Sequence, residues 1–239
     1  MSQSSQLRIG KSLVIAIDGP SGSGKSSVAR EIAQRLGLAY QDTGAMYRAL
    51  ALVCLENGVS VQNQAAVEAL AKRFYFEQWF DPGVGMVAAG ADAEHALDVT
   101  DEIREPRVSE AVSAVATNLG ARTELIRRQR AAIESVRHRM VVEGRDITTV
   151  VAPQAEVRLL LTASEEARLA RRGAQLAASG ESQSAEQVAA QVLARDAKDS
   201  TVVEFQRAAD GVVTIDSSDL DFEQTVQAVL RLVQENVGG

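Results

Sequence analysis

The chain of 239 residues has a formal net charge of -7, with 25 lysine and arginine residues against 32 aspartate and glutamate residues. This length suits one large domain, or a core with inserts, rather than two independent domains. The acidic balance disfavours a nucleic-acid partner, because long-range electrostatics would repel a polynucleotide. The single cysteine, Cys54, excludes an internal disulfide and a cysteine-based metal site, and its apolar neighbours predict that it is buried.

The N-terminal segment predicts where the protein resides. Residues 1–11 are mostly polar, and the apolar stretch that follows, at residues 13–17, is too short for a signal-peptide core or a membrane span. We therefore predict a disordered tail over residues 1–11, a cytoplasmic protein and no membrane association.

Residues 19–26 fit the pattern G-x-x-x-x-G-K-[ST] and directly follow the apolar run at residues 13–17. This pattern is typical of a phosphate-binding loop, in which a buried strand leads to a turn whose backbone N–H groups point at one anion. The helix that follows adds its positive dipole end. A glycine- and serine-rich linker is the alternative, but linkers do not follow a buried strand.

Individual residues of this loop have separate expected roles. Gly19, Gly22 and Gly24 are expected to take backbone angles that are closed to other residues. Lys25 can reach the β- and γ-phosphates of a nucleotide, and the Ser26 hydroxyl can ligate the accompanying Mg²⁺.

Hydrophobic periodicity predicts the elements of the N-terminal half. An amphipathic helix over residues 28–36 ends at a glycine, a short strand covers residues 38–42, and helices follow over residues 43–57 and 65–73. Two strand–helix units in succession imply a parallel sheet covered by helices. The aromatic run at residues 74–79 and the apolar run at residues 84–88 flank turn residues and predict an antiparallel hairpin in an inserted subdomain.

The same periodicity predicts the helices and strands of the C-terminal half. Residues 106–137 are predicted to be helical with a break at residues 118–120, and residues 140–143, 157–161 and 212–216 read as strands. The closing helix is marked by four apolar residues at helical spacing: Phe222, Val226, Val229 and Val233.

Between the last two strands lies a basic helical pair. Ser164 is expected to cap the first helix, the polar stretch 177–182 interrupts the pair, and a capping box at residues 184–187 opens the second helix. A basic pair with a flexible tip predicts a lid.

A phosphate loop alone leaves three classes open, namely a small-molecule kinase, a GTP switch and an ATP-driven motor or transport subunit. The N-K-x-D motif that reads guanine is absent, and the chain is short and acidic for a motor on nucleic acid. Arginines on several separate elements fit a reaction that joins two polyphosphate groups, because arginine grips phosphate with two hydrogen bonds. These residues are Arg48, Arg122, Arg145, Arg168, Arg171, Arg172 and Arg195.

Five further motifs resemble those of bacterial cytidylate kinases and, with the loop, span nearly the whole chain in the order of that family. They are D-T-G-A-M-Y-R at 42–48, D-V-T-D-E-I-R at 98–104, R-R-Q-R at 127–130, E-G-R-D-I at 143–147 and R-D-A-K-D-S at 195–200. The resemblance implies transfer of the γ-phosphoryl group of ATP to CMP or dCMP with Mg²⁺. A kinase of another small acceptor, or a nucleotide-binding module without turnover, stays open as an alternative.

The resemblance also implies a division of the chain. A P-loop NTPase core comprises residues 12–43, 118–165 and 205–239, a nucleoside-monophosphate-binding subdomain with a small antiparallel sheet comprises residues 44–117, and a lid comprises residues 166–204. We expect a monomer.

Site residues follow from the resemblance position by position. The expected ATP-binding residues are Gly19, Pro20, Ser21, Gly22, Ser23, Gly24, Lys25, Ser26, Ser27, Arg168 and Arg172. The expected CMP-binding residues are Ser113, Arg122 and Asp146 at the cytosine, Arg48 and Arg145 at the acceptor phosphate, Arg195 near the phosphates, Asp199 at the sugar, and Thr43. Lys25, Arg145, Arg172 and Arg195 are the expected catalytic residues.

These assignments agree with the chemistry of the reaction. The second pKa of a phosphate monoester is about 6. The acceptor oxygen is therefore largely ionised at neutral pH, and no general base is needed. Cytosine offers an amino donor beside two acceptors, which a carboxylate, an arginine and a hydroxyl can satisfy together. Uracil would place a carbonyl against the carboxylate of Asp146 and be rejected by about 1–3 kcal/mol.

The sequence departs from the family pattern at two positions. Thr148 stands where the family usually has glycine, and Val202 stands where it has arginine; the usual Pro-Leu is also missing around residues 204–207. The second departure predicts weaker binding of the acceptor, because one charge-assisted hydrogen bond is lost.

Overall fold

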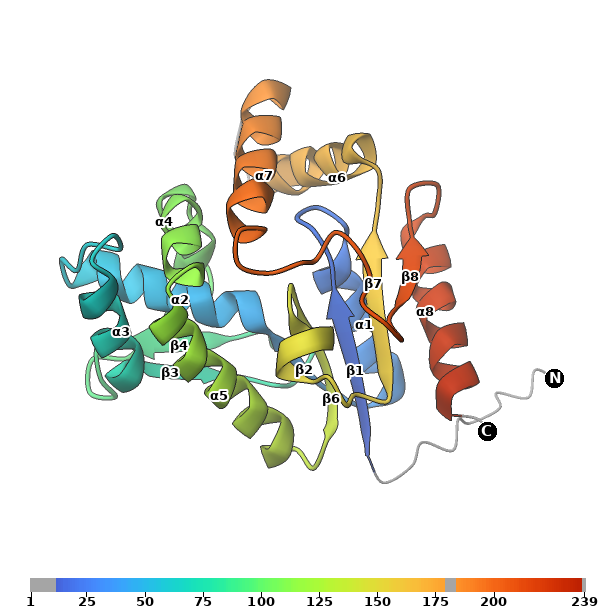
Figure 1. Cartoon of the computed structure of the whole chain (residues 1–239), viewed down its shortest axis with the longest axis horizontal. Coiled ribbons are helices and arrows are strands. Elements are labelled where there is room, and N and C mark those ends of the chain that lie inside the picture. Colours follow the sequence, from blue (N-terminus) through green and yellow to red (C-terminus); the bar gives the residue numbers. More distant parts are fainter. Residues whose placement is uncertain (1–11, 179–183, 238–239) are drawn as a thin grey trace.

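The computed structural model describes residues 12–178 and 184–237, and within them five parallel strands form the central sheet (Figure 1). The strand order is β2-β6-β1-β7-β8. The bounds are Leu13–Asp18 for β1, Ala39–Asp42 for β2, Arg139–Gly144 for β6, Val157–Thr162 for β7 and Val213–Asp216 for β8. The predicted α/β fold with a parallel sheet is confirmed. The predicted tail lies outside the described residues.

Helices cover both faces of this sheet. α1 (Lys25–Leu36) and α8 (Phe222–Val237) pack on one face, and α5 (Leu119–Ser135) packs on the other beside η2 (Ile147–Val151), a single turn of π-helix. Every residue of β1 is buried, which is why residues 13–17 form a continuous apolar run rather than an alternating pattern.

α8 buries Val226, Val229 and Val233 as predicted. The fourth marker of this helix, Phe222, is 50% exposed. All four residues that mark the closing helix lie in α8, and Phe222, as its first residue, lies at the surface end of the apolar stripe.

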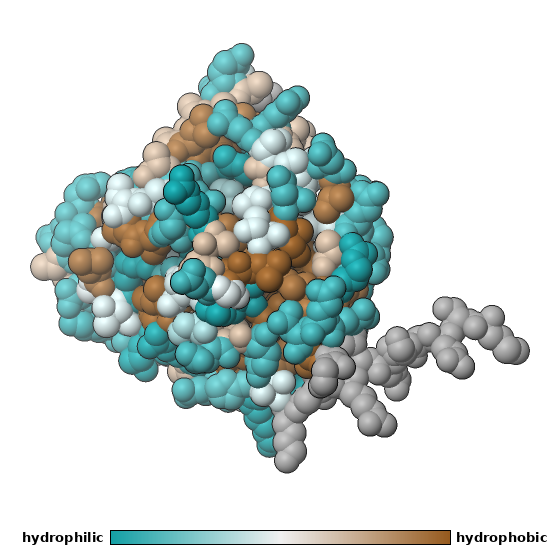
Figure 2. Space-filling view, turned by 45° about the vertical axis from the view of Figure 1, so that its right-hand side comes forward, coloured by the Kyte–Doolittle hydropathy of each residue, from teal (hydrophilic) through white to brown (hydrophobic). Residues whose placement is uncertain are grey.

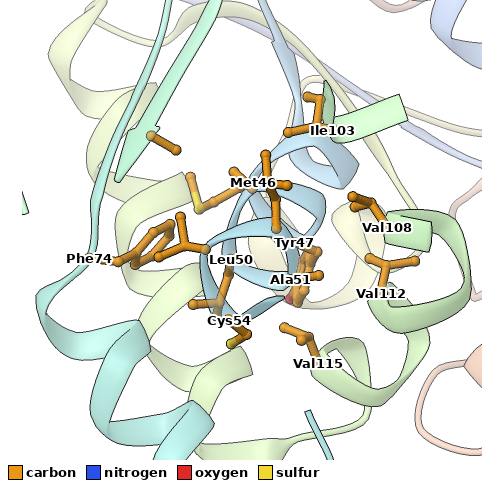
Figure 3. Packing of buried hydrophobic residues seen from close by; sticks show 14 of the residues in the cluster. Met46, Tyr47, Leu50, Ala51, Cys54, Phe74, Ile103, Val108, Val112 and Val115 are labelled. Atoms are coloured by element: carbon orange, nitrogen blue, oxygen red, sulfur yellow. The ribbon is translucent and has the colours of Figure 1, made fainter. Parts of the chain in front are cut away.

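The inserted part forms a second apolar core around α2 (Thr43–Glu56). Figure 3 shows side chains of α2 between Phe74 on one side and Val108, Val112 and Val115 of α4 on the other, and Cys54 is fully buried among them. Its other helices are α3 (Gln64–Arg73), η1 (Glu102–Arg104) and α4 (Pro106–Ala116).

The antiparallel sheet of this part differs in detail from the predicted hairpin. It has the order β3-β4-β5, with bounds Tyr75–Gln78, Val87–Gly90 and Leu97–Asp98. The hairpin itself is confirmed, but its second strand lies further along the chain than expected, because the turn is longer and runs through a Gly85 with a φ of 62°. The two-residue strand β5 was not predicted.

The basic pair forms α6 (Glu165–Ala178) and α7 (Ala185–Asp199), which lie beyond the end of β1 in Figure 1. The Ser164 hydroxyl accepts from the Ala167 N–H at 3.2 Å, and Ser184 and Gln187 form the predicted capping box. Most of the predicted interruption at residues 177–182 lies outside the described residues.

Hydrophobic residues reach the surface in separate patches on the face drawn in Figure 2, with hydrophilic residues between them. Among the described helices, none combines the length and the apolar character that crossing a membrane requires.

Candidate active site

The site begins where three neighbouring strands end. The register of the sheet sets Asp42 at the end of β2 beside Glu143 of β6, and Gly144 beside Asp18 at the end of β1. The phosphate loop follows Asp18 and lies below α6 and α7 in Figure 1. Several polar groups therefore meet at the carboxyl ends of the strands, where parallel sheets bind their ligands.

The glycines of the loop are needed for two different reasons. Gly22 and Gly24 have φ values of 77° and 87°, as expected for a loop whose N–H groups point inward. The expectation for Gly19 was wrong, because Gly19 is not among the residues with positive φ. A Cβ there would lie 2.4 Å from the Leu161 carbonyl oxygen, so close packing on β7 is the reason for glycine.

Lys25 and Ser26, the first residues of α1, both face Glu143. The Ser26 hydroxyl donates to Glu143 Oε1 at 2.7 Å, and Lys25 Nζ lies 3.9 Å from Glu143 Oε2. Burial raises the pKa of Glu143 to about 7, with the negative charge of Asp42 adding to the rise. Burial lowers the pKa of Lys25, an effect that the Glu143 carboxylate opposes.

A cleft of about 510 Å³ adjoins this group, and residues of the loop, α2, α4, α6 and α7 line it. Of the predicted site residues, those in its lining are Ser21, Gly22, Lys25, Ser26, Thr43, Arg48, Arg122, Arg145, Asp146, Arg172, Arg195 and Asp199. The predicted residues outside this lining are Gly19, Pro20, Ser23, Gly24, Ser27, Ser113 and Arg168. Ser113 is 5% exposed on α4. Val202 also lines the cleft.

One part of the cleft holds a buried ion pair. Arg122 of α5 donates through Nη2 to Asp146 Oδ2, and the two side chains are 12% and 8% exposed. Arg122 also donates to the Ala116 carbonyl at 3.3 Å. Thr43 is held nearby by a hydrogen bond of 2.9 Å to the Glu143 carbonyl. A carboxylate and a guanidinium fixed side by side present both acceptors and donors to a ligand.

A second network joins arginines to two aspartates of α7. Arg145 donates to Asp196 at 2.9 Å, lies 3.0 Å from Asp199, and has its guanidinium 4.3 Å from the centre of the Phe205 ring. Arg195 lies 3.7 Å from the same Asp199. Both arginines therefore have carboxylate partners on α7.

Asp196 also reaches the phosphate loop. Its carboxylate accepts from the Ser21 N–H at 3.2 Å and from Arg168 at 2.6 Å. Although burial acts in the opposite direction, the guanidinium of Arg145 lowers the pKa of Asp196, so the carboxylate is charged. Asp196 takes the place of an anion between the loop and two arginines.

The other predicted arginines have their own partners. Arg48 donates to the Ile103 carbonyl at 3.1 Å and to the Ser109 hydroxyl at 2.9 Å, and burial lowers its pKa. Arg172 donates to Gln175 at 2.8 Å. Both line the same cleft as Lys25.

Sequence reasoning missed several residues of the site. Glu143 and Asp196 stand inside quoted motifs but were not chosen, and an acidic residue at the end of a buried strand was the signal for Glu143. Arg171 was grouped with the lid, yet it donates to the Ser23 carbonyl of the loop at 3.2 Å and to Ser217 after β8. Nothing in the sequence distinguishes Arg171 from its neighbours.

Comparison with known proteins gives consistent results. The family model described as "Cytidylate kinase" matches residues 15–235. A protein named cytidylate kinase from Cutibacterium acnes is 46% identical over 222 residues, covering 92% of this chain and 96% of that protein. Another of that name from Rhodococcus jostii is 43% identical over 227 residues, covering 95% and 96%.

Among solved structures, an uncharacterized protein from Eubacterium ventriosum superposes with a TM-score of 0.50 at 9% identity, over 93% of this chain and 98% of that chain. At this identity the likeness shows the fold alone.

Proposed function

The chain belongs to the cytidylate kinase family, and on that premise we propose that it transfers the γ-phosphoryl group of ATP to CMP or dCMP, giving ADP and CDP or dCDP. The resemblance drawn from its motifs is confirmed, and so is the class of enzyme, a nucleoside monophosphate kinase. The observation that carries the proposal is the Arg122–Asp146 pair in the same cleft as Lys25.

The pair suits cytosine for a chemical reason. The Asp146 carboxylate can accept from the amino group of cytosine, while Arg122 can donate to the neighbouring ring acceptors. Uracil has a carbonyl where cytosine has the amino group, so it would face Asp146 with a like partial charge. Ser113 of α4 completes the proposed set, and it is buried outside the lining of the cleft.

The phosphates are assigned to the remaining cations. Arg48 and Arg145 bind the acceptor phosphate, Lys25 and the loop amides bind the donor phosphates, and Arg195 lies near both. Asp199 binds the sugar, and Arg168 and Arg172 close over ATP. Catalysis then consists of in-line positioning and charge neutralisation, because the acceptor oxygen is already ionised.

The residues at the loop fit a magnesium ion held together with the nucleotide. The Ser26 hydroxyl and the Glu143 carboxylate are hydrogen-bonded to each other, and both are oxygen ligands of the kind that Mg²⁺ takes beside phosphates. Among the described residues no group of three or more acidic, histidine or cysteine side chains could hold a metal by itself. When bound, the ion neutralises charge on the β- and γ-phosphates.

We also propose that residues 44–117 act as the acceptor subdomain and residues 166–204 as the lid on a core of residues 12–43, 118–165 and 205–239. The protein works as a monomer in the cytoplasm, with ATP and CMP or dCMP as its small-molecule partners.

An ADP-release assay tests the function directly. ATP and Mg²⁺ are offered with CMP, dCMP, UMP, AMP, GMP or no acceptor, and the highest kcat/KM is expected for CMP or dCMP. Higher activity with AMP or GMP would overturn the cytosine assignment. ATP binding without ADP release for any acceptor would instead make the chain a nucleotide-binding module.

A further inference from the structure

Asp18 is a buried carboxylate to which the proposed reaction gives no part. It ends the central strand β1, is 3% exposed, and stands one residue before the phosphate loop. Its carboxylate accepts hydrogen bonds from the first two residues of η2, which follows β6. A buried carboxylate needs several donors to be tolerated, so its partners define what it does.

Three donors from two adjacent residues meet this carboxylate. The Ile147 N–H donates to Oδ1 at 2.8 Å, and the Thr148 N–H donates to Oδ2 at 2.9 Å. The Thr148 hydroxyl donates to the same Oδ2 at 2.6 Å. Thr148 is 3% exposed, so water does not compete for these bonds. Charge-assisted bonds in such a setting are among the strongest in proteins.

The segment so held carries the residues that meet the ligand. Arg145 and Asp146 directly precede Ile147, and the Asp146 carbonyl accepts from the Val150 and Val151 N–H groups to start the turn of π-helix. π-helical turns are rare, and this one is held from outside at both ends, by Asp18 at its first two N–H groups and by Arg130 at the Val150 and Val151 carbonyls. The backbone of Asp146 is therefore fixed at a φ of -142° between β6 and a turn that Asp18 holds in place.

We propose that Asp18 and the Thr148 hydroxyl are positioning residues that set base selectivity by holding Asp146 against Arg122. This inference rests on the proposed function, since it assigns the selectivity of that same cleft. A glycine, which the family usually has at this position, could not supply the third donor, so the hydroxyl bond to Asp18 is a feature of this chain. Neither Asp18 nor Thr148 lines the cleft, so both act through Asp146.

The test compares Thr148→Val, which removes the hydroxyl and keeps the shape, with Thr148→Ser, which restores a hydroxyl. Thr225→Val is the matched control, because Thr225 is similarly buried and its hydroxyl donates locally, at 2.8 Å to the carbonyl of Asp221, the residue just before α8. Asp18→Asn is a second variant with a larger expected effect. The NH2 group of its amide would face the N–H and hydroxyl donors of Ile147 and Thr148.

Thr148→Val is expected to lower the ratio of kcat/KM for CMP to kcat/KM for UMP about tenfold, the size of one hydrogen bond to a charged group. The KM for ATP should stay at its wild-type value, Thr148→Ser should regain most of the ratio, and Thr225→Val should keep it. A ratio that is unchanged in Thr148→Val, or activities on CMP and UMP that fall in equal proportion, would overturn the inference.

Hydrogen exchange separates this inference from the proposed function. The backbone N–H groups of Ile147 and Thr148 should exchange faster in Thr148→Val and in Asp18→Asn than in wild type and Thr225→Val. If the wild type shows no preference for CMP, the proposed function fails while the exchange result still reports on the anchor. If exchange at these two groups is unchanged, the anchor itself is wrong.

Discussion

The phosphate loop and the helices across the cleft from it are held by different kinds of contact. The loop rises from a strand that is buried along its whole length and presents mainly backbone N–H groups, whose positions its neighbours fix. α6 and α7 share a small apolar cluster of Leu176, Val188 and Val192. They contact the rest of the site through charged side chains, in ion pairs such as that of Asp196 with Arg145 and in hydrogen bonds such as those of Arg171 with Ser23 and Ser217.

This difference matches what each side has to do. A cradle of backbone groups needs no rearrangement when an anion arrives, so it favours binding from the outset. Ion pairs between carboxylates and arginines can be exchanged for ion pairs between phosphates and the same arginines at little net cost. We therefore expect the loop side to be preformed and the side formed by α6 and α7, the proposed lid, to move when the phosphates bind.

The largest expected effect comes from the loop side. Lys25→Ala should lower kcat by about 10²–10³-fold, as for other groups that stabilise charge in a transition state. The melting temperature should change little, because Lys25 is a partly buried cation whose removal relieves a desolvation cost. Steady-state kinetics and thermal unfolding measure both.

Lys72→Ala is the matched control for this variant, since Lys72 is 61% exposed on α3 and pairs only with Glu68. If Lys25→Ala has the same turnover as the control, Lys25 has no role in catalysis. The proposed difference between the loop and the side formed by α6 and α7 would then be wrong.

The next effect tests the side of the cleft formed by α6 and α7, where phosphates can replace aspartates as partners of the arginines. Arg145→Lys should lower kcat/KM for CMP about 10- to 100-fold, because an ammonium cannot make the paired contacts of a guanidinium or stack on Phe205. Arg107→Lys serves as control, since Arg107 is 50% exposed and pairs with Glu105 and Glu56 on the surface. Equal kcat/KM for the two variants would show that a point charge suffices at residue 145.

A smaller effect should come from Val202. It is half-buried and lines the cleft, so a longer side chain has room to extend. Val202→Arg should lower the KM for CMP several-fold with little change in kcat. This result is expected when a new contact binds the substrate and the transition state equally well.

The competing outcome for Val202→Arg is a protein destabilised by a buried, unpaired guanidinium. Melting temperature and KM measured on the same variant distinguish the two, with Val213→Arg on the exposed strand β8 as control. A KM that does not fall, or a lost fold, would contradict the prediction.

The smallest effect is a change of shape. Phosphates of a bisubstrate analogue should replace Asp196 and Asp199 as partners of the arginines and draw α6 and α7 inward. Small-angle scattering should then give a slightly smaller radius of gyration than for the ligand-free protein. Inorganic phosphate at equal ionic strength is the control. Identical scattering profiles with and without the analogue would show that α6 and α7 do not move inward.

Much of the fold could be predicted from local sequence patterns, because each element carries its own signal. The continuous apolar run of β1, the glycine after α1 and the capping box of α7 act within a few residues of one another. The strand order β2-β6-β1-β7-β8 could not be predicted, since it depends on pairing between distant segments. The strand β5 has two residues, too few for a pattern.

The residues of the site could likewise be predicted only where their signal is local in the sequence. The phosphate loop was found because its function resides in consecutive residues. The partners of Arg168, Arg171 and Arg172 could not be found, because successive residues of a helix point in directions about 100° apart. Arg168 meets Asp196, and Arg171 meets the loop and Ser217, so one basic run serves two unrelated purposes.

The buried Cys54 has a practical consequence for studying how the protein opens. Burial raises the pKa of this thiol to about 11, and thiol reagents attack the thiolate of an exposed sulfur. Because the chain has a single cysteine, any labelling reports on one place, the core around α2. The labelling rate thus counts how often that core unfolds locally, and bound CMP, if it bridges α2 and α5, should slow the rate without any engineered probe.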